Sequence, residues 1–205
     1  MDVARLAAKT HLQRLLCFLQ AGLLVASGAM IGPAGASDAP AAVRVVHVGY
    51  GINQVQLTGD GVRGMLVRAR RDNGNAHGFD SLAIYALASS KEHPEVNFLA
   101  VPVWGTDGKE RIELTAGGGA DCKLNDFRFV AQPGMDLQLI VAERDFGSSF
   151  ADNELVTFTY FQLERNETVE MGRPLYYFES VKTSRSAQKY CDVGEAFKRE
   201  LGIEE

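Results

Sequence analysis

Apolar residues after Val43 come in short runs that glycine, asparagine, aspartate and proline separate. Short runs rich in Val, Ile, Phe and Tyr are typical of β-strands. The pattern predicts strands over 43–48, 65–71, 81–87, 96–103, 111–115, 124–130, 137–143, 155–164 and 175–183. In the run 156–161, apolar residues and threonines alternate until Phe161, as in a sheet with one face toward the core. The chain is therefore predicted to be mostly β.

Turn-forming residues punctuate these runs at regular intervals. The segments 59–61, 72–75, 107–108, 117–119 and 133–134 are built from Gly, Asp, Asn and Pro, which tolerate a positive φ or preset a turn. About nine strands spaced in this way favour a sandwich or a barrel over a parallel α/β sheet.

The period of the pattern changes near the C-terminus. Val193, Ala196, Phe197 and Leu201 fall on one face of a helix. Asp192 is the expected N-cap, with Glu195 three positions later in a capping-box-like start, and Gly202 is the expected stop. The sequence predicts a short amphipathic helix here.

Residues 1–36 have the three-part pattern of a secretory signal peptide. Arg5, Lys9 and Arg14 form a basic region, the stretch 15–31 is apolar, and Ala34-Gly35-Ala36 offers a cleavage site. An uncleaved transmembrane anchor is the alternative, since a span needs about 20 apolar residues. Pro33 and the neighbouring small residues favour cleavage, so the protein is expected to be periplasmic or secreted.

The remaining residues, 37–205, are enough for one ordinary domain with its own core. The full chain has a formal net charge of −5, and removal of residues 1–36 makes it −7. This balance argues against nucleic acid or an anionic membrane as a partner. No later stretch of the sequence is apolar for long enough to span a membrane.

Two cysteines, Cys122 and Cys191, remain after cleavage. An even pair in an oxidising compartment predicts a disulfide, with two buried free thiols as the alternative. Such a bond would hold the predicted helix against the sheet.

Residues that could carry out catalysis are few. The histidines His47, His77 and His93 lack the spacing of metal ligands, and neither a G-x-S-x-G turn nor a phosphate-binding loop is present. We therefore expect a protein that is not an enzyme and that needs no cofactor.

Asp60 lies at the centre of a Gly-Asp-Gly segment, Gln56–Gly64, that resembles the calcium turns of β-proteins. Oxygen ligands at alternating positions let one loop wrap a hard cation. Only Asp60 supplies a carboxylate here, and Arg63 adds a repelling charge. A plain hairpin turn is the simpler interpretation, and a structural cation at Asp60 is the alternative.

A second polar cluster contains Asp72, Asn73, Asn75, His77 and Asp80, in a loop between two predicted strands. These side chains could form a cation or partner site. Asn and Asp also satisfy the backbone of any long loop, so the cluster has a purely structural interpretation as well.

Several of these features together resemble the CarG-like carbapenem intrinsic resistance proteins, periplasmic β-sandwiches related in fold to bacterial inhibitors of I-type lysozyme. The resemblance spans about 45–201. It rests on the early Gly-Asp-Gly turn, the Asp- and Asn-rich hairpin, Asp126-Phe127-Arg128, the strand 156–161, Gly172-Arg173-Pro174-Leu175-Tyr176 and the helix that includes 193–197.

The resemblance implies an antiparallel two-sheet β-sandwich with a short C-terminal helix, a homodimer and a bound cation. Asp60 is the position that matches a cation site, whereas Gly64 stands where an outer ligand is expected. The function it implies is that of a non-enzymatic periplasmic protein that binds an unidentified protein or small molecule. An inhibitor of a lysozyme-like hydrolase and a structural envelope domain are the alternatives.

Overall fold

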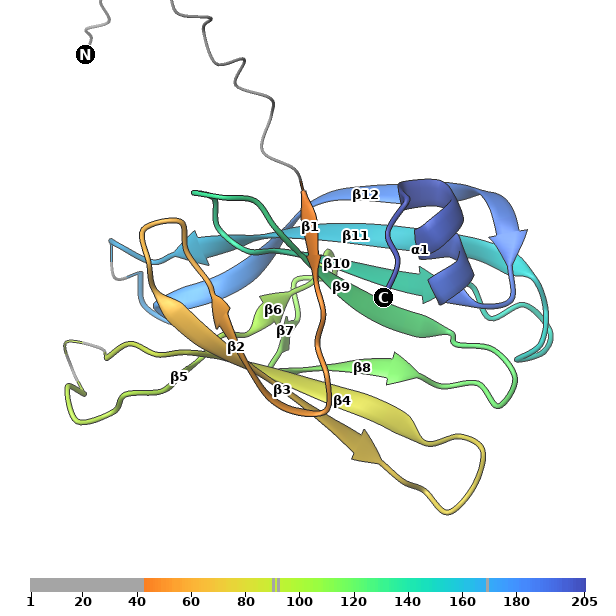
Figure 1. Ribbon diagram of the computed structural model, residues 1–205, viewed down its shortest axis with the longest axis horizontal. Helices are drawn as coiled ribbons and strands as arrows, with labels where there is room; N and C mark the ends of the chain where they lie inside the picture. Colours follow the sequence, from red (N-terminus) through yellow and green to blue (C-terminus); the bar gives the residue numbers. More distant parts are fainter. Residues whose placement is uncertain (1–42, 90, 92, 169) are drawn as a thin grey trace, which may run out of the picture. The chain divides into compact units, whose positions relative to one another are not determined.

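The computed structural model describes residues 43–89, 91, 93–168 and 170–205. The predicted signal peptide, 1–36, lies outside these residues. The described part contains one helix, α1 (Val193–Leu201), and twelve strands. The strands are β1 (Arg44–Val46), β2 (Gly51–Gln56), β3 (Arg63–Arg71), β4 (Phe79–Ala86), β5 (Leu99–Ala100), β6 (Val103–Trp104), β7 (Glu110–Arg111), β8 (Glu113–Gly117), β9 (Asn125–Ala131), β10 (Gln138–Arg144), β11 (Glu154–Arg165) and β12 (Tyr176–Tyr190) (Figure 1).

These strands form one continuous, open sheet in the order β2-β3-β4-β8-β9-β10-β11-β12-β6-β7, with β1 on β9 and β5 on β4. The prediction of a mostly β chain with a short C-terminal helix is confirmed, and the hydrogen-bonded strands form one mixed sheet. β8 and β9 are joined through the register pair Gly117 and Asn125, and β12 pairs with β6 in parallel. Gly117 has a φ of 120°, which favours glycine, so the chain can turn here without breaking the ladder.

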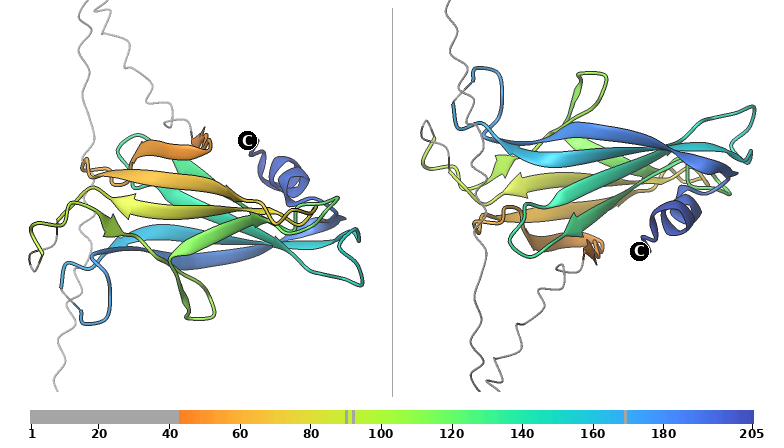
Figure 2. Two further views of the ribbon diagram at one scale, coloured as in Figure 1. Left: turned by 90° about the horizontal axis from the view of Figure 1, so that it is seen from below. Right: turned by 90° about the horizontal axis from the view of Figure 1, so that it is seen from above.

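The main core lies between the two halves of this sheet. Leu66, Leu82 and Leu114 from the half that contains β3, β4 and β8 belong to the same buried cluster as Phe129 and Phe178 from β9 and β12. In Figure 2, β2, β3 and β4 (orange to yellow) lie on one side of the molecule, and β11 and β12 (cyan to blue) lie on the other. The packing is therefore sandwich-like, although the hydrogen-bonded sheet is continuous.

A second buried cluster covers the outer face of β10 and β11 beneath α1. Leu139 belongs to the main core, whereas Ile140, the next residue, belongs to this second cluster with Phe158 and Phe197. Successive side chains of a strand point to opposite faces, so this half of the sheet is covered on both sides. The sequence suggested that Phe161 ends the alternation of β11. Because β11 is buried on both faces, Phe161 instead lies in the main core, on the face opposite to Phe158.

The C-terminal helix forms as predicted. The Asp192 carboxylate accepts a hydrogen bond from the backbone N–H of Gly194 at 2.7 Å, and Gly202 caps the other end with a φ of 67°. Phe197 is fully buried, and its ring lies 5.5 Å from that of Phe158. Glu195 pairs with Arg199 along the helix at 2.9 Å. The apolar face therefore attaches α1 to the outer face of the sheet.

The predicted disulfide between Cys122 and Cys191 is present, with its Cα atoms 5.5 Å apart. It joins the β8–β9 loop to the residue before the helix cap. The backbone N–H of Lys123 donates to the Asp192 carboxylate at 3.1 Å, and that of Val193 donates to the Lys123 carbonyl at 3.1 Å. The start of α1 is thus held by a covalent bond and by two hydrogen bonds beside it.

Two strands differ from the prediction because their residues are polar. β2 was missed, since Asn53, Gln54 and Gln56 on this edge strand give it little apolar character. β12 continues to Tyr190 instead of ending near Thr183, because its outer positions carry exposed polar side chains. The predicted strand 96–103 is divided between β5 and β6.

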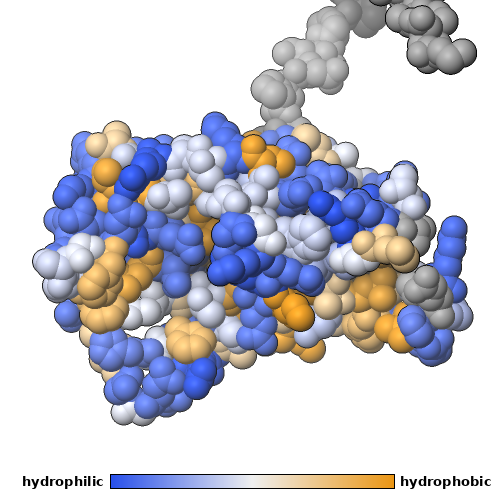
Figure 3. All heavy atoms as spheres, turned by 180° about the vertical axis from the view of Figure 1, so that it is seen from behind, coloured by the Kyte–Doolittle hydropathy of each residue, from blue (hydrophilic) through white to orange (hydrophobic). Residues whose placement is uncertain are grey.

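Exposed apolar side chains are scattered over several elements of the described chain. On the face that Figure 3 shows, hydrophobic residues form small patches among hydrophilic ones. Scattered apolar residues of this kind are ordinary for a folded protein. No described helix is long and apolar enough to cross a membrane.

Candidate functional site

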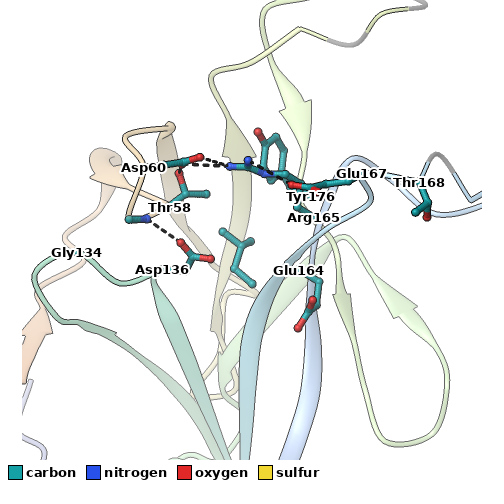
Figure 4. Close-up of a pocket in the computed structure, with 11 residues that line it drawn as sticks. Thr58, Asp60, Gly134, Asp136, Glu164, Arg165, Glu167, Thr168 and Tyr176 are labelled. Carbon is teal, nitrogen blue, oxygen red and sulfur yellow. Dashed lines mark hydrogen bonds and ion pairs between the residues drawn. The ribbon is translucent and has the colours of Figure 1, made fainter. Parts of the chain in front are cut away.

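A polar cavity of about 620 Å³ lies at one end of the sheet, where three connections meet (Figure 4). They are the β2–β3 turn, the β9–β10 turn and the segment in which β11 ends. The lining residues are Thr58, Gly59, Asp60, Gly134, Asp136, Leu163, Glu164, Arg165, Glu167, Thr168 and Tyr176. The cavity contains Asp60, the position at which the sequence suggested a site.

The β2–β3 turn is closed by its own polar groups. The Thr58 hydroxyl accepts a hydrogen bond from the backbone N–H of Val62 at 2.9 Å and donates to the Asp60 carboxylate. Gly61 has a φ of 106°, which an L side chain rarely adopts. The sequence order Thr-Gly-Asp-Gly therefore folds locally into a turn that holds the Asp60 side chain over the cavity.

The β2–β3 and β9–β10 turns are in close contact. The backbone N–H of Gly59 donates to the Asp136 carboxylate at 2.7 Å, and that of Leu137 donates to the Leu57 carbonyl at 2.8 Å. A Cβ atom on Gly59 would lie 2.3 Å from the Gly134 carbonyl oxygen. Glycine is needed at residue 59 because no side chain fits between the two backbones.

Asp60 forms an ion pair across the cavity. The Arg165 guanidinium donates to both carboxylate oxygens, at 2.9 and 3.1 Å, and stacks over the Tyr176 ring at 5.4 Å (Figure 4). The hydrogen bonds from Thr58 and Arg165 hold the pKa of the Asp60 carboxyl below its usual value, and the bond to Asp60 raises the pKa of Arg165. A cation at Asp60 would have to displace this guanidinium.

No described part of the chain brings together three or more His, Cys, Asp or Glu side chains in a way that could hold a metal ion. Asp60 belongs to the β2–β3 turn and Asp136 contacts it. Asp60 binds Arg165, and Asp136 accepts a hydrogen bond from the Gly59 backbone. The structural cation suggested at Asp60 stays a prediction without a ligand set around it.

The cavity has an excess of acidic groups. The lining contains four acidic residues, Asp60, Asp136, Glu164 and Glu167, and one cation, Arg165, which also lies 3.8 Å from Glu167. The Glu164 carboxylate points away from the Asp60–Arg165 pair (Figure 4). The lining residues include no His, Cys, Lys or Ser. The arrangement is suited to hydrogen-bonding a polar ligand.

The second predicted cluster is divided by the structure. Asp72 and Asn75 accept hydrogen bonds from backbone N–H groups of their own loop at 2.8 and 2.9 Å, and Asn73 donates to a loop carbonyl at 3.0 Å. These three side chains stabilise the β3–β4 turn. They face no common ligand site with Asp80.

Asp80 lies inside the molecule instead, on β4, where 7% of its side chain is exposed. Arg68 donates to it at 2.7 Å, Arg70 at 3.1 Å and the Tyr50 hydroxyl at 3.1 Å. Burial raises the pKa of the Asp80 carboxyl, but these three hydrogen bonds outweigh burial and hold it below its usual value. Grouping Asp80 with the loop was wrong, because strand alternation turns its side chain toward the β3 arginines.

One spacing associated with serine nucleophiles occurs in the chain, Ser186-Ala187-Gln188-Lys189. It lies on β12, where the register with β11 shifts between Arg185 and Lys189. The Ser186 hydroxyl is buried and donates to the Gln188 carbonyl at 2.6 Å. Lys189 is exposed and pairs with Glu154 at 2.8 Å. Each of the two side chains is therefore engaged with a different partner.

Several cavity residues were not predicted from the sequence. Asp136, Arg165, Glu167 and Tyr176 belong to loops and strand ends that are far from Asp60 in the sequence. The turn at 133–134 was predicted, so Asp136 could be placed next to a turn from the sequence alone. Nothing local indicated which other turn it would meet.

A family model described as carbapenem resistance protein CarG-like matches residues 48–199. The chain belongs to this family. The crystal structure of CarG matches with a TM-score of 0.62 and 21% sequence identity, and the match covers 76% of this chain and 94% of that chain. A search of curated protein sequences finds no match.

The CarG-like match contains both turns of the cavity, the Arg165 end of β11 and most of α1. At 21% identity, the likeness to CarG shows the fold alone. The family match confirms the resemblance found in the sequence motifs. The I-type lysozyme inhibitors are absent from these matches.

Proposed function

We propose that this CarG-like protein is an exported, non-enzymatic protein that protects a bacterial cell against carbapenems by binding a partner or small molecule. The family match over residues 48–199 carries the proposal. The Cys122–Cys191 disulfide supports export, because such bonds persist in oxidising compartments. The basic and apolar pattern of residues 1–36 supports it independently.

Binding, rather than catalysis, is supported by the polar cavity. Asp60 and Asp136 are engaged by Arg165 and by the Gly59 backbone N–H respectively, and the lining hydroxyl groups have no histidine or lysine beside them among the lining residues. The separation of Ser186 and Lys189 on β12 argues in the same direction. Loops held on a rigid sheet are a common place for binding sites. We propose this cavity as the contact region.

The test is expression of the full chain in a carbapenem-susceptible Gram-negative host. We expect the minimum inhibitory concentration of a carbapenem to rise several-fold. The rise should be lost when residues 1–36 are removed and reduced in Arg165→Ala. Arg185→Ala, which removes a surface ion pair with Asp145 outside the cavity, is the matched control and should keep the rise. An unchanged inhibitory concentration with the full chain would contradict protection.

The non-enzymatic part of the proposal needs its own measurement. The purified protein is incubated with a carbapenem, with and without zinc, and loss of the β-lactam absorbance is followed. We expect the rate to equal that of buffer. Hydrolysis that scales with protein concentration would show that the protein is an enzyme.

A further inference from the structure

Three cations from separate segments converge on the side chain of Glu205. Arg68 of β3 approaches it at 3.2 Å, Lys123 of the β8–β9 loop at 3.6 Å and Arg128 of β9 at 3.9 Å. Glu205 lies outside the residues that match the CarG-like family, and this cluster is separate from the cavity at Asp60. The cluster joins the two halves of the sheet around one carboxylate.

The two arginines are held in place from several sides. The side chains of Arg68 and Arg128 are 11% and 7% exposed. Arg68 donates to the Val48 carbonyl at 2.8 Å, and its guanidinium lies 5.8 Å from the centre of the Phe127 ring. Arg128 donates to the Phe127 carbonyl at 2.7 Å and lies 4.8 Å from the centre of the Phe197 ring. Fixed guanidinium groups of this kind lose little entropy when they bind a carboxylate.

The cluster carries more positive than negative charge. Asp80 is shared by Arg68 and Arg70, and Asp126 is shared by Lys123 and Arg128. Counted over side chains alone, Arg68, Arg70, Lys123 and Arg128 carry two more charges than Asp80 and Asp126, and the Glu205 side chain offsets one of these two.

Local pKa values and an unpaired donor agree with this charge balance. Burial raises the pKa of Glu205. The neighbouring charges of Lys123, Arg128 and Arg68 and the hydrogen bond from Arg68 lower it by more, so the net shift is downward. The buried Nε of Arg128 has no hydrogen-bond partner. The surroundings therefore favour an anion at this position.

Glu205 can leave this position without unfolding its neighbours. Its side chain is 44% exposed, and it lies two residues past Ile203, whose backbone N–H donates to the Phe197 carbonyl at 3.1 Å. Rotation of the Glu205 side chain leaves that bond and α1 in place. Only about 10 Å³ is free in the cleft that Glu205 lines with Arg68 and Arg128, so a second carboxylate fits only when Glu205 moves out.

We propose that Arg68, Lys123 and Arg128 form a binding site for a small carboxylate, and that Glu205 is its exchangeable internal occupant. A carboxylate ligand would accept hydrogen bonds from the two guanidinium groups and contact the Lys123 ammonium, as Glu205 does. The affinity of the site for an external carboxylate is lowered by competition from Glu205. This site does not depend on the proposed function.

Acetate tests the proposal directly, because Glu205→Ala removes the methylene and carboxylate that acetate would replace. Purified wild type and Glu205→Ala are titrated with sodium acetate against sodium chloride at equal ionic strength, and the arginine side-chain N–H resonances are followed by NMR. We expect saturable shifts of the Arg68 and Arg128 signals, with at least tenfold tighter acetate binding in Glu205→Ala. Acetate should also raise the melting temperature of this variant more than chloride does.

Glu204→Ala is the matched control, since Glu204 pairs with Lys198 on the surface at 2.9 Å. It should bind acetate no better than the wild type. A double variant, Lys123→Ala with Glu205→Ala, should lose part of the gained affinity. Equal acetate responses in Glu205→Ala and Glu204→Ala, with both folded by their NMR spectra, would overturn the proposal.

Discussion

Removal of the disulfide should lower the stability of the protein by about 4 kcal/mol. Cys122 and Cys191 are 69 positions apart, and closing a loop of this length removes entropy from the unfolded chain that is worth about 4 kcal/mol at 25 °C. The native contacts of α1 are independent of the bond, because Phe197 stays buried and Val193 stays hydrogen-bonded to Lys123. The effect is therefore expected mainly in the unfolded state.

The assay is urea unfolding of protein purified from an oxidising compartment, compared with the double variant Cys122→Ala and Cys191→Ala. With a slope of about 2 kcal/mol per M, the loss corresponds to a midpoint lower by about 2 M. Far-UV circular dichroism in buffer should be unchanged. A reducing agent should shift the midpoint of the wild type and leave that of the variant where it is.

A stability loss below about 1 kcal/mol in a variant that keeps the native spectrum would contradict this entropic role of the bond. Thiol titration of the denatured, unreduced wild type gives a separate check. We expect no free thiol from Cys122 or Cys191, and two free thiols would show that the bond is not formed in the protein.

Three further substitutions test the packing, the buried charges and the turn contact. Phe197→Ala should cost about 3–5 kcal/mol of unfolding free energy by chemical denaturation, because a fully buried ring leaves a cavity between α1 and the sheet; Phe197→Leu should cost less. Asp80→Asn should cost about 3 kcal/mol at pH 7, since it leaves buried Arg68 without its carboxylate. Because the pKa of Asp80 is lowered by folding, its contribution is present above about pH 4, the range of an unfolded aspartate, and is lost as pH falls through the folded pKa; the variant should therefore lose less stability than the wild type on acidification, and parallel curves would argue against this role. Gly59→Ala should lower the melting temperature and cost about 1–3 kcal/mol through its clash with the Gly134 carbonyl, whereas Gly49→Ala, whose nearest neighbour would be 3.7 Å away, should change little.

Much of the secondary structure could be predicted because it depends on neighbouring residues. The Asp192 cap, the apolar face of α1 and the Gly202 stop are local signals, and all three are found in the structure. The strands with strong apolar runs were found as well. β2 was missed because an edge strand needs little apolar character when its neighbour β3 supplies the hydrogen bonds.

The candidate cavity could be predicted only in part. Asp60 was singled out because Gly-Asp-Gly is a recognisable turn, and the structure places it in the cavity. Its partner Arg165 is 105 positions away, and no local pattern connects the two. Asp80 shows the opposite case, since its position beside Asn-rich residues suggested a loop site while strand alternation turned it inward.

The sequence by itself determined the β class, the C-terminal helix with its caps, the turns and the cysteine pair, because each depends on residue type and short spacing. The tertiary structure decided how the two halves of the sheet meet and which charges lie together. Turns distant in sequence close the cavity at Asp60, and Arg68, Lys123 and Arg128 converge on Glu205. The physical reason is that an ion pair acts between atoms a few ångströms apart in space, whatever their separation along the chain.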